Sequence, residues 1–359
     1  MESLARHNKK MATVSSPTSS LATDTQFFGH PRGLMVCFAT EMWERFSFYG
    51  MKYLLLLYLT KYHLFSDSNG LEVLGSYAAL VYAMPVLGGL LADRYLGMRK
   101  AVVFGGILLV LGHLGMALEG EQARREGDQI LRDQAALQVF YLSLALIVIG
   151  VGFLKPNIST IVGRLYGRDD PRRDAGFTIF YMGINLGAFA ATLLCGYLGE
   201  TFGWRYGFGV AGLGMLVGLA TFLSGQRHLQ GQAEPKDPEL LKKQSPLGLN
   251  IENTIYLCGL LAVAVAWQML QFHGAVGKLL NAMSLAVALG LGWFIIFKCD
   301  PIERSRMIVL MVLTLSTVVF WALFAQSAGS MTLFADRVMD RNILGFELTA
   351  SQFGALNAF

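Results

Sequence analysis

The chain has 359 residues, of which 54% are hydrophobic and 15% are charged. A typical soluble domain has about 25% charged residues, so this composition excludes an ordinary water-soluble domain. The formal net charge is only +4, which indicates no nucleic-acid partner. The four cysteines lie in or beside apolar segments without metal-ligand spacing, so we expect neither a metal nor another cofactor.

Apolar stretches of about 20 residues, long enough to cross a hydrocarbon core of roughly 30 Å, recur along the sequence. They predict an all-α polytopic membrane protein. The nine predicted spans are 34–59, 71–92, 101–118, 136–162, 175–198, 206–223, 254–270, 282–298 and 307–326.

One long polar connection follows the sixth span and carries three prolines, which indicates a linker between two helix bundles. Another apolar stretch begins at Leu348 close to the last residue, so we expect the second bundle to be truncated. The predicted divisions are a mobile cytoplasmic tail (1–33), a six-helix bundle (34–225), a cytoplasmic linker (226–250), a two-helix hairpin (251–299) and the start of a C-terminal bundle (300–359).

Basic residues are distributed unequally over the two sides of the predicted spans. If the amino terminus is cytoplasmic, its side of the membrane holds 18 lysines and arginines, and the opposite side holds eight. Because Lys and Arg are enriched in cytoplasmic loops, this asymmetry predicts a cytoplasmic amino terminus. We expect a multi-pass protein of the plasma (inner) membrane whose first span acts as an uncleaved anchor.

The first span carries four charged residues, although a charge at the bilayer centre costs at least about 2.5 kcal/mol. With two aromatic residues they fall within an arc of roughly 140° and form one wall: Glu41, Glu44, Arg45, Phe48, Tyr49 and Lys52. A carboxylate that gains a proton releases the cation it held, so the wall indicates a protonation switch. The alternative is a static salt-bridge cluster that fixes the helix register.

Polar residues in other spans add to this wall. Lys155 precedes Pro156 in the fourth span and is deep enough to need an anionic partner, unless its side chain extends to the cytoplasmic face. In the fifth span, Gly183 and Gly187 have the spacing of a close helix contact, and Asn185 lies between them. Asn185 either binds a ligand or packs against another helix. Tyr82 and Trp321 are residue types that line small-molecule sites, although core packing is equally open for each.

Four sequence runs together resemble the proton-dependent oligopeptide transporter family (POT, or PTR2) of the major facilitator superfamily. The run 41–50, EMWERFSFYG, is similar to the family motif ExxERFxYYG. The run 89–97, GLLADRYLG, matches the family's loop between the second and third helices. The runs 153–157 and 177–189 fit its fourth and fifth helices, and the charge-free hairpin resembles two extra helices of prokaryotic members.

The resemblance implies the major facilitator fold, with two six-helix bundles and an inserted two-helix hairpin. It also implies a symporter that imports di- and tripeptides with protons by alternating access, and not an enzyme. The implied proton-coupling residues are Glu41, Glu44, Arg45 and Lys155. The implied peptide-binding residues are Arg45, Tyr49, Lys52, Tyr82, Lys155, Asn185 and Trp321. The expected partners are small peptides, protons and the lipid bilayer.

Two positions depart from the family pattern. Phe48 stands where the motif commonly has a tyrosine, and Ala325 stands where many members carry an acid. Asp336 lies three turns beyond Ala325; we interpret it as a loop charge, with substitution for the missing acid as the alternative. Two other functions stay open: a proton-coupled porter of nitrate or another small anion, and a membrane-embedded enzyme.

Overall fold

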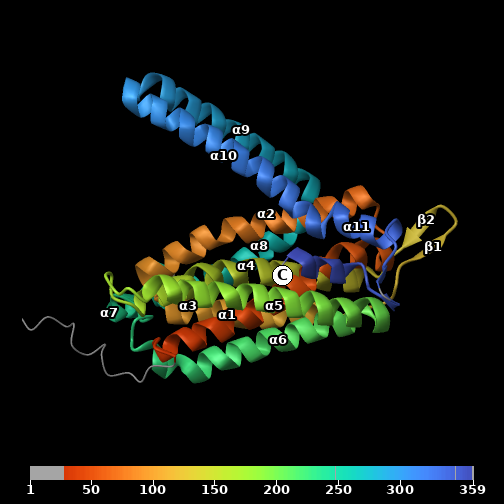
Figure 1. Cartoon of the computed structure of the whole chain (residues 1–359), viewed down its shortest axis with the longest axis horizontal. Helices are drawn as coiled ribbons and strands as arrows, with labels where there is room; N and C mark the ends of the chain where they lie inside the picture. The colour runs from red at the N-terminus through yellow and green to blue at the C-terminus, as the bar shows by residue number, and fades with distance from the viewer. Residues whose placement is uncertain (1–27, 247, 344, 358–359) are drawn as a thin grey trace, which may run out of the picture.

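The structure, a computed structural model, describes residues 28–246, 248–343 and 345–357. Most of the predicted mobile tail, 1–27, therefore lies outside the described residues. Six long helices run back and forth along an elongated bundle (Figure 1). Their bounds are α1 Arg32–Leu57, α2 Asp67–Leu91, α3 Met98–Met116, α4 Gln134–Arg164, α5 Arg173–Phe202 and α6 Trp204–Gly225.

Short elements connect these helices. The π-helical turns η2 (Tyr58–Tyr62) and η3 (Ala92–Leu96) extend α1 and α2. The antiparallel strands β1 (Arg124–Glu126) and β2 (Gln129–Leu131) join α3 to α4. We call the end of the bundle with these strands the strand end, and the opposite end, where residues 226–246 lie, the linker end.

The rest of the chain contains helices η4 Gln226–Leu229, α7 Pro238–Lys242, α8 Ile251–Gln271, α9 His273–Phe297, α10 Pro301–Ala325, η5 Gln326–Ala328, α11 Ser330–Arg337 and η6 Ser351–Asn357. Strands β3 (Asn342–Ile343) and β4 (Phe346–Glu347) form a second antiparallel hairpin. α8 and α9 are separated by Phe272 alone, so α9 begins nine residues before the predicted span 282–298. Lys278, which precedes that predicted span, lies in the second turn of α9.

Eight of the described helical segments are long and apolar enough to cross a membrane. α1 is absent from this group although it has 26 residues, because it carries Glu41, Glu44, Arg45 and Lys52. All four are more than half buried within the bundle or line its cavity, so protein and not lipid surrounds them. The all-α membrane architecture predicted from the sequence is confirmed.

Close helix contacts in the bundle depend on residues without side chains. A Cβ atom on Gly152 of α4 would lie 2.8 Å from the Cβ of Met84 in α2. Because Pro156 has no N–H, it leaves the carbonyl of Gly152 without its usual helical donor, and Gly88 of α2 packs directly against that carbonyl. The contact brings α2 and α4 together one turn from Lys155.

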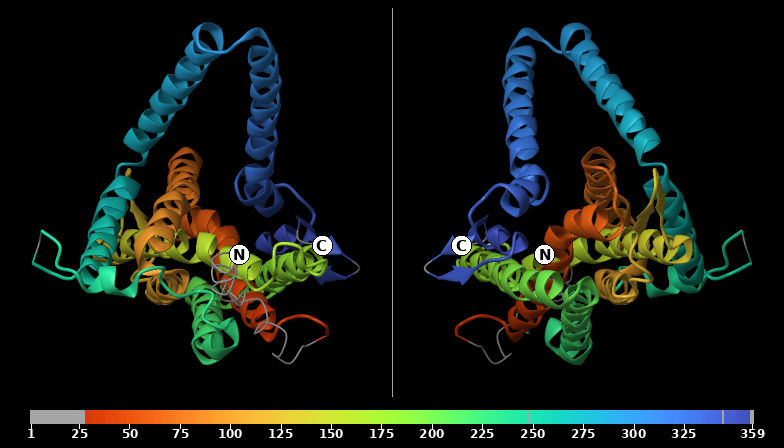
Figure 2. Two further views of the ribbon diagram at one scale, coloured as in Figure 1. Left: turned by 90° about the vertical axis from the view of Figure 1, so that its left-hand side faces the viewer. Right: turned by 90° about the vertical axis from the view of Figure 1, so that its right-hand side faces the viewer.

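The hairpin is fixed to the first bundle along α8 and leaves it along α9. At the linker end, Lys100 Nζ lies 2.5 Å from a carboxylate oxygen of Glu252 in α8. At the strand end, the amide of Gln138 donates to that of Gln271 over 3.0 Å. α9 and α10 then extend away from the bundle as a pair (Figures 1 and 2), and no residue of α10 is buried.

We predict that Gly152→Leu destabilises the bundle by about 1 to 3 kcal/mol, because the added side chain has no space between α2 and α4. Thermal unfolding of the purified protein in detergent measures the effect. Gly290→Leu is the matched control, since a Cβ on Gly290 of α9 meets no atom within 4 Å. Equal unfolding temperatures for the two variants would contradict the prediction.

Candidate functional site

Three charged side chains of α1 form a buried cluster. The exposed fractions of Glu41, Glu44 and Arg45 are 3%, 1% and 4%. The Nε atom of Arg45 lies 3.0 Å from a carboxylate oxygen of Glu41, and it forms a second ion pair with Glu44. The spacing of the three residues on one helix face brings two carboxylates to a single guanidinium.

Neighbouring helices hold this part of α1 in place. A Cβ on Gly187 of α5 would lie 3.1 Å from the Cβ of Arg45, so only glycine lets α5 approach the cluster this closely. On another side, the hydroxyl of Ser47 donates to the carbonyl of Ala211 in α6 over 2.5 Å. The predicted close contact at Gly187 is therefore present, and its partner is the helix that carries the cluster.

The cluster retains unused hydrogen-bonding capacity. Glu41 Oε2, Glu44 Oε1 and Arg45 Nη2 are buried and have no hydrogen-bond partner among the described residues. Phe48 packs against the guanidinium of Arg45, with 5.2 Å from its Cζ to the ring centroid. Phe48 therefore attracts the Arg45 guanidinium through its ring face, and it lacks the hydroxyl that a tyrosine would add at this position.

Lys155 does not join the cluster directly. Its ammonium lies 5.1 Å from the ring centroid of Tyr82, and it forms no ion pair within the described part of the chain. Glu44 and Glu41 still contribute to its electrostatic environment. The predicted direct partnership between Lys155 and these glutamates is therefore not seen in this conformation, in which an aromatic ring holds the ammonium.

A cavity of about 850 Å³ lies between α2 and the carboxyl end of α10. Lys52, Tyr82 and Trp321 line it, and the rings of Tyr82 and Trp321 are 6.4 Å apart. Tyr82 thereby connects Lys155 to this cavity. Ala325 also lies in the wall, so a methyl group occupies the position at which the resemblance implies an acid.

Two predicted site residues are placed less directly. Tyr49 stands beside the cavity, since the ammonium of Lys52 lies 5.9 Å from its ring centroid. The amide of Asn185 donates to the carbonyl of Tyr181 in its own helix over 3.3 Å, and Asn185 does not line the cavity. The structure thus brings together the predicted residues of α1, α2, α4 and α10, but leaves Asn185 apart.

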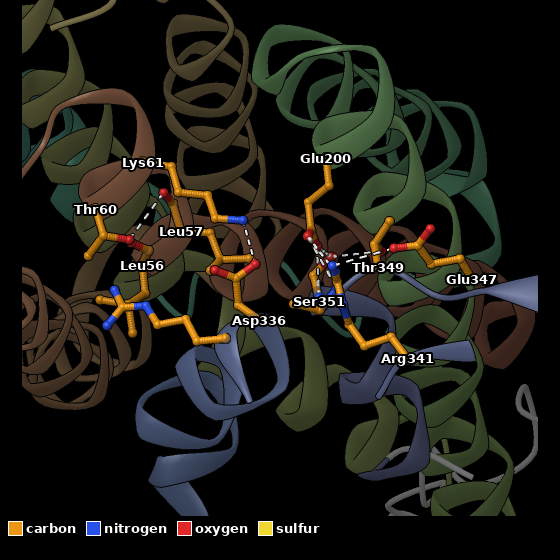
Figure 3. Close-up of polar contacts among 12 residues, drawn as sticks. Leu56, Leu57, Thr60, Lys61, Glu200, Asp336, Arg341, Glu347, Thr349 and Ser351 are labelled. Carbon is orange, nitrogen blue, oxygen red and sulfur yellow. Dashed lines mark hydrogen bonds and ion pairs between the residues drawn. The ribbon is translucent and has the colours of Figure 1, made fainter. Parts of the chain in front are cut away.

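Polar contacts that the sequence analysis did not predict join the two parts of the chain at the strand end (Figure 3). Lys61 of η2 forms an ion pair with Asp336 of α11. The next residue, Arg337, donates to both carboxylate oxygens of Asp67 over 2.6 and 2.8 Å. Asp336 is therefore part of a helix and not a loop, and its carboxylate binds Lys61 outside the cavity.

Glu200, at the end of α5, makes a second set of contacts there (Figure 3). Its carboxylate accepts from the backbone N–H of Ser351 over 2.8 Å, from the Ser351 hydroxyl over 2.5 Å and from the N–H of Ala350 over 3.2 Å. Arg341 lies 3.9 Å from the same carboxylate. Hydropathy gives no signal for such contacts, because their partners, such as Glu200 and Ser351, are far apart in the sequence.

Comparison with known proteins agrees with this architecture. The family model described as "PTR2: POT family" matches residues 99–359. The chain is 38% identical over 343 residues to an uncharacterized transporter, YclF, of Bacillus subtilis, covering 92% of this chain and 65% of that protein. It is 36% identical over 354 residues to the peptide transporter YePEPT of Yersinia enterocolitica, with the same coverages of 92% and 65%. The chain thus spans about two thirds of the length of these relatives.

Solved structures give the same result. The crystal structure of a peptide transporter POT in complex with sulfate superposes with a TM-score of 0.75 at 35% identity, covering 93% of this chain and 67% of that one. A POT family transporter in complex with 5-aminolevulinic acid superposes with a TM-score of 0.72 at 28% identity, covering 93% and 68%. From the family model, the relatives and the shared fold, this chain belongs to the POT family.

Proposed function

We propose that the protein is a proton-coupled symporter that imports di- and tripeptides by alternating access. The observation that carries the proposal is the buried Glu41–Arg45–Glu44 cluster on the helix that also presents Lys52 to the 850 Å³ cavity. A relative at 33% identity, from Lactococcus lactis, is a di-/tripeptide transporter, which supports the same cargo here.

The charges of the cluster suit a proton-binding group. Two carboxylates and one guanidinium have a net charge of −1, so a single added proton makes the cluster neutral. In a bundle interior, an uncompensated charge is costly, and the proton therefore changes the energy of the whole region. Because Glu41 and Glu44 both interact electrostatically with Lys155, protonation of either one changes the electrostatic potential at the Lys155 ammonium.

The cations suit the carboxylate of a peptide. The guanidinium of Arg45 is already engaged by two glutamates, whereas Lys155 has only the face of Tyr82 as a partner within the described residues. A peptide carboxylate at Tyr82 gains an ion pair with Lys155 without breaking an existing one. Protonation of Glu41 or Glu44 frees hydrogen-bonding capacity of Arg45 for the same carboxylate.

The contacts at the strand end support alternating access. Asp336, Arg337 and Glu200 connect the first bundle to the segments after α10 (Figure 3), whereas α10 diverges from the bundle toward the linker end (Figure 1). This is the arrangement expected for a carrier closed at one end of its site and open at the other. We place the linker end in the cytoplasm, in accordance with the distribution of basic residues.

The orientation predicts that a cysteine at Ser245, in the linker, is not labelled by an impermeant thiol reagent added outside intact cells. It is labelled after the cells are permeabilised. The test uses a variant in which the four native cysteines are replaced, and a cysteine at Asp128 in the β1–β2 turn is the control for the opposite side. Labelling of Ser245→Cys in intact cells would contradict the cytoplasmic position of the linker and indicate the opposite orientation.

We predict that Arg45→Lys raises the half-saturating concentration for dialanine uptake at least tenfold. Lysine retains the charge but cannot hold two carboxylates with a planar fork, and a lost charge-assisted hydrogen bond costs about 1.5 to 3 kcal/mol. Uptake into proteoliposomes measures the effect. Arg99→Lys, which alters an exposed pair with Glu234, is the matched control. Wild-type affinity in Arg45→Lys would limit Arg45 to a structural role.

A variant of Glu44 separates proton coupling from the movement of the peptide. Glu44→Gln mimics the protonated side chain, so we expect it to abolish uphill uptake of dialanine driven by a pH gradient. Exchange of dialanine between two peptide-containing compartments requires no net proton movement and is retained. Glu252→Gln, which affects an ion pair outside the cavity, is the control and retains both activities. Loss of both activities in Glu44→Gln would assign Glu44 to cargo binding or folding, and retention of both would remove it from coupling.

A further inference from the structure

A second, basic cavity lies between α4 and α5 at the linker end. Its volume is about 550 Å³, and no acidic side chain is among the residues that line it: Ser159, Thr160, Gly163, Arg164, Tyr166, Arg168, Arg173, Phe177 and Gln232. We call this the arginine pocket. It shares no lining residue with the cavity at Tyr82 and Trp321.

The four arginines of this region differ in how far they are already paired. Arg172 lies outside the pocket and binds Asp170 through two hydrogen bonds of 2.7 and 3.0 Å. These bonds lower the pKa of Asp170 to about 2, so the pair stays intact at physiological pH. Arg164 donates to the carbonyl of Gln232 over 3.3 Å and lies 3.7 Å from Asp93.

The guanidinium groups of Arg168 and Arg173 have N–H donors that no acid in the described part of the chain engages. Neither forms an ion pair among the described residues, and Arg173 Nε is buried without a hydrogen-bond partner. The pocket hydroxyls of Ser159 and Thr160 donate to the carbonyl of Pro156 over 3.2 and 2.8 Å. The free donors of the pocket thus include the guanidinium groups of Arg168 and Arg173, which match a carboxylate geometrically.

The helix faces connect this pocket to the proposed peptide site. Ser159 and Gly163 lie four and eight residues after Lys155, on the same face of α4. On α5, Arg173, Phe177 and Tyr181 are likewise spaced by four residues, and Tyr181 is exposed. Two adjacent helix faces thus lead from the level of Lys155 to the pocket.

The pocket is offset from Lys155 along α4. Eight residues of helix correspond to about 12 Å. An extended dipeptide spans about 7 Å and a tripeptide about 10 Å, so neither reaches from Lys155 to the level of Gly163.

We propose that the arginine pocket is a second binding site for the carboxylate of a small peptide, occupied on the cytoplasmic side of the central site. This inference rests on the proposed function. The pocket receives a departing peptide through Arg168 and Arg173, and shortens the time during which its carboxylate lacks a cationic partner.

The test measures dialanine transport from each side of oriented proteoliposomes. Arg168→Gln raises the half-saturating concentration of dialanine on the linker-end side about fivefold, the size of one exposed charge interaction. The value on the strand-end side does not change. Arg168→Gln/Arg173→Gln produces a larger increase on the same side only. Arg227→Gln removes an arginine from the same end outside the pocket and leaves both values unaltered.

Three outcomes overturn the inference. An unchanged value on the linker-end side removes peptide binding from the pocket, and equal changes on both sides indicate an effect on the central site or on folding. If the variants lose only a dependence on phosphatidylglycerol, with unchanged dialanine values in phosphatidylcholine vesicles, the pocket binds a lipid phosphate. Failure of the wild-type protein to transport dialanine refutes the proposed function itself, which distinguishes the two failures.

Discussion

The ion pairs of Arg45 with two buried glutamates are the constraint on which the first bundle depends. Their three side chains are nearly inaccessible to solvent, so each charge requires its partners to stay in place. This requirement explains why α5 approaches through glycine at Gly187 and why Ser47 ties α1 to α6. The helix least suited to lipid is consequently the one most enclosed by protein.

Under the proposed function, the same constraint couples the cluster to one proton. A well-matched pair of one acid and one base is neutral and gains little from protonation. Two acids that share one base are different, because they retain a negative charge that a proton removes. Among the described residues, no donor satisfies the buried oxygens Glu41 Oε2 and Glu44 Oε1, so the form with both carboxylates ionised keeps unused acceptors.

Much of the fold and part of the site were predictable from the sequence. Long apolar runs identified the spans, and intramembrane charges identified the α1 cluster, because both signals are local. The position of Lys155 was not predictable: its depth indicated a carboxylate partner, but the geometry of α2 places the ring of Tyr82 there. Asn185 was predicted to bind a ligand or to pack against another helix, but its side-chain amide donates to the carbonyl of Tyr181 in the same helix. Contacts such as Glu200 with Ser351 depend on how distant segments meet, which periodicity does not encode.

The docking of α8 determines where the chain can bend between its two parts. The proline-containing linker has the composition of a flexible connection, but Arg99 binds Glu234 in it and Lys100 binds Glu252 just after it. The described part of the linker and α8 are therefore fixed to the first bundle. In α9, only Val276 and Ile295 are buried, so packing against the rest of the chain restrains this helix less than it restrains α8. Because protein leaves most of the α9 surface uncovered, a bilayer around it would act through its thickness on this connection between the two parts of the chain.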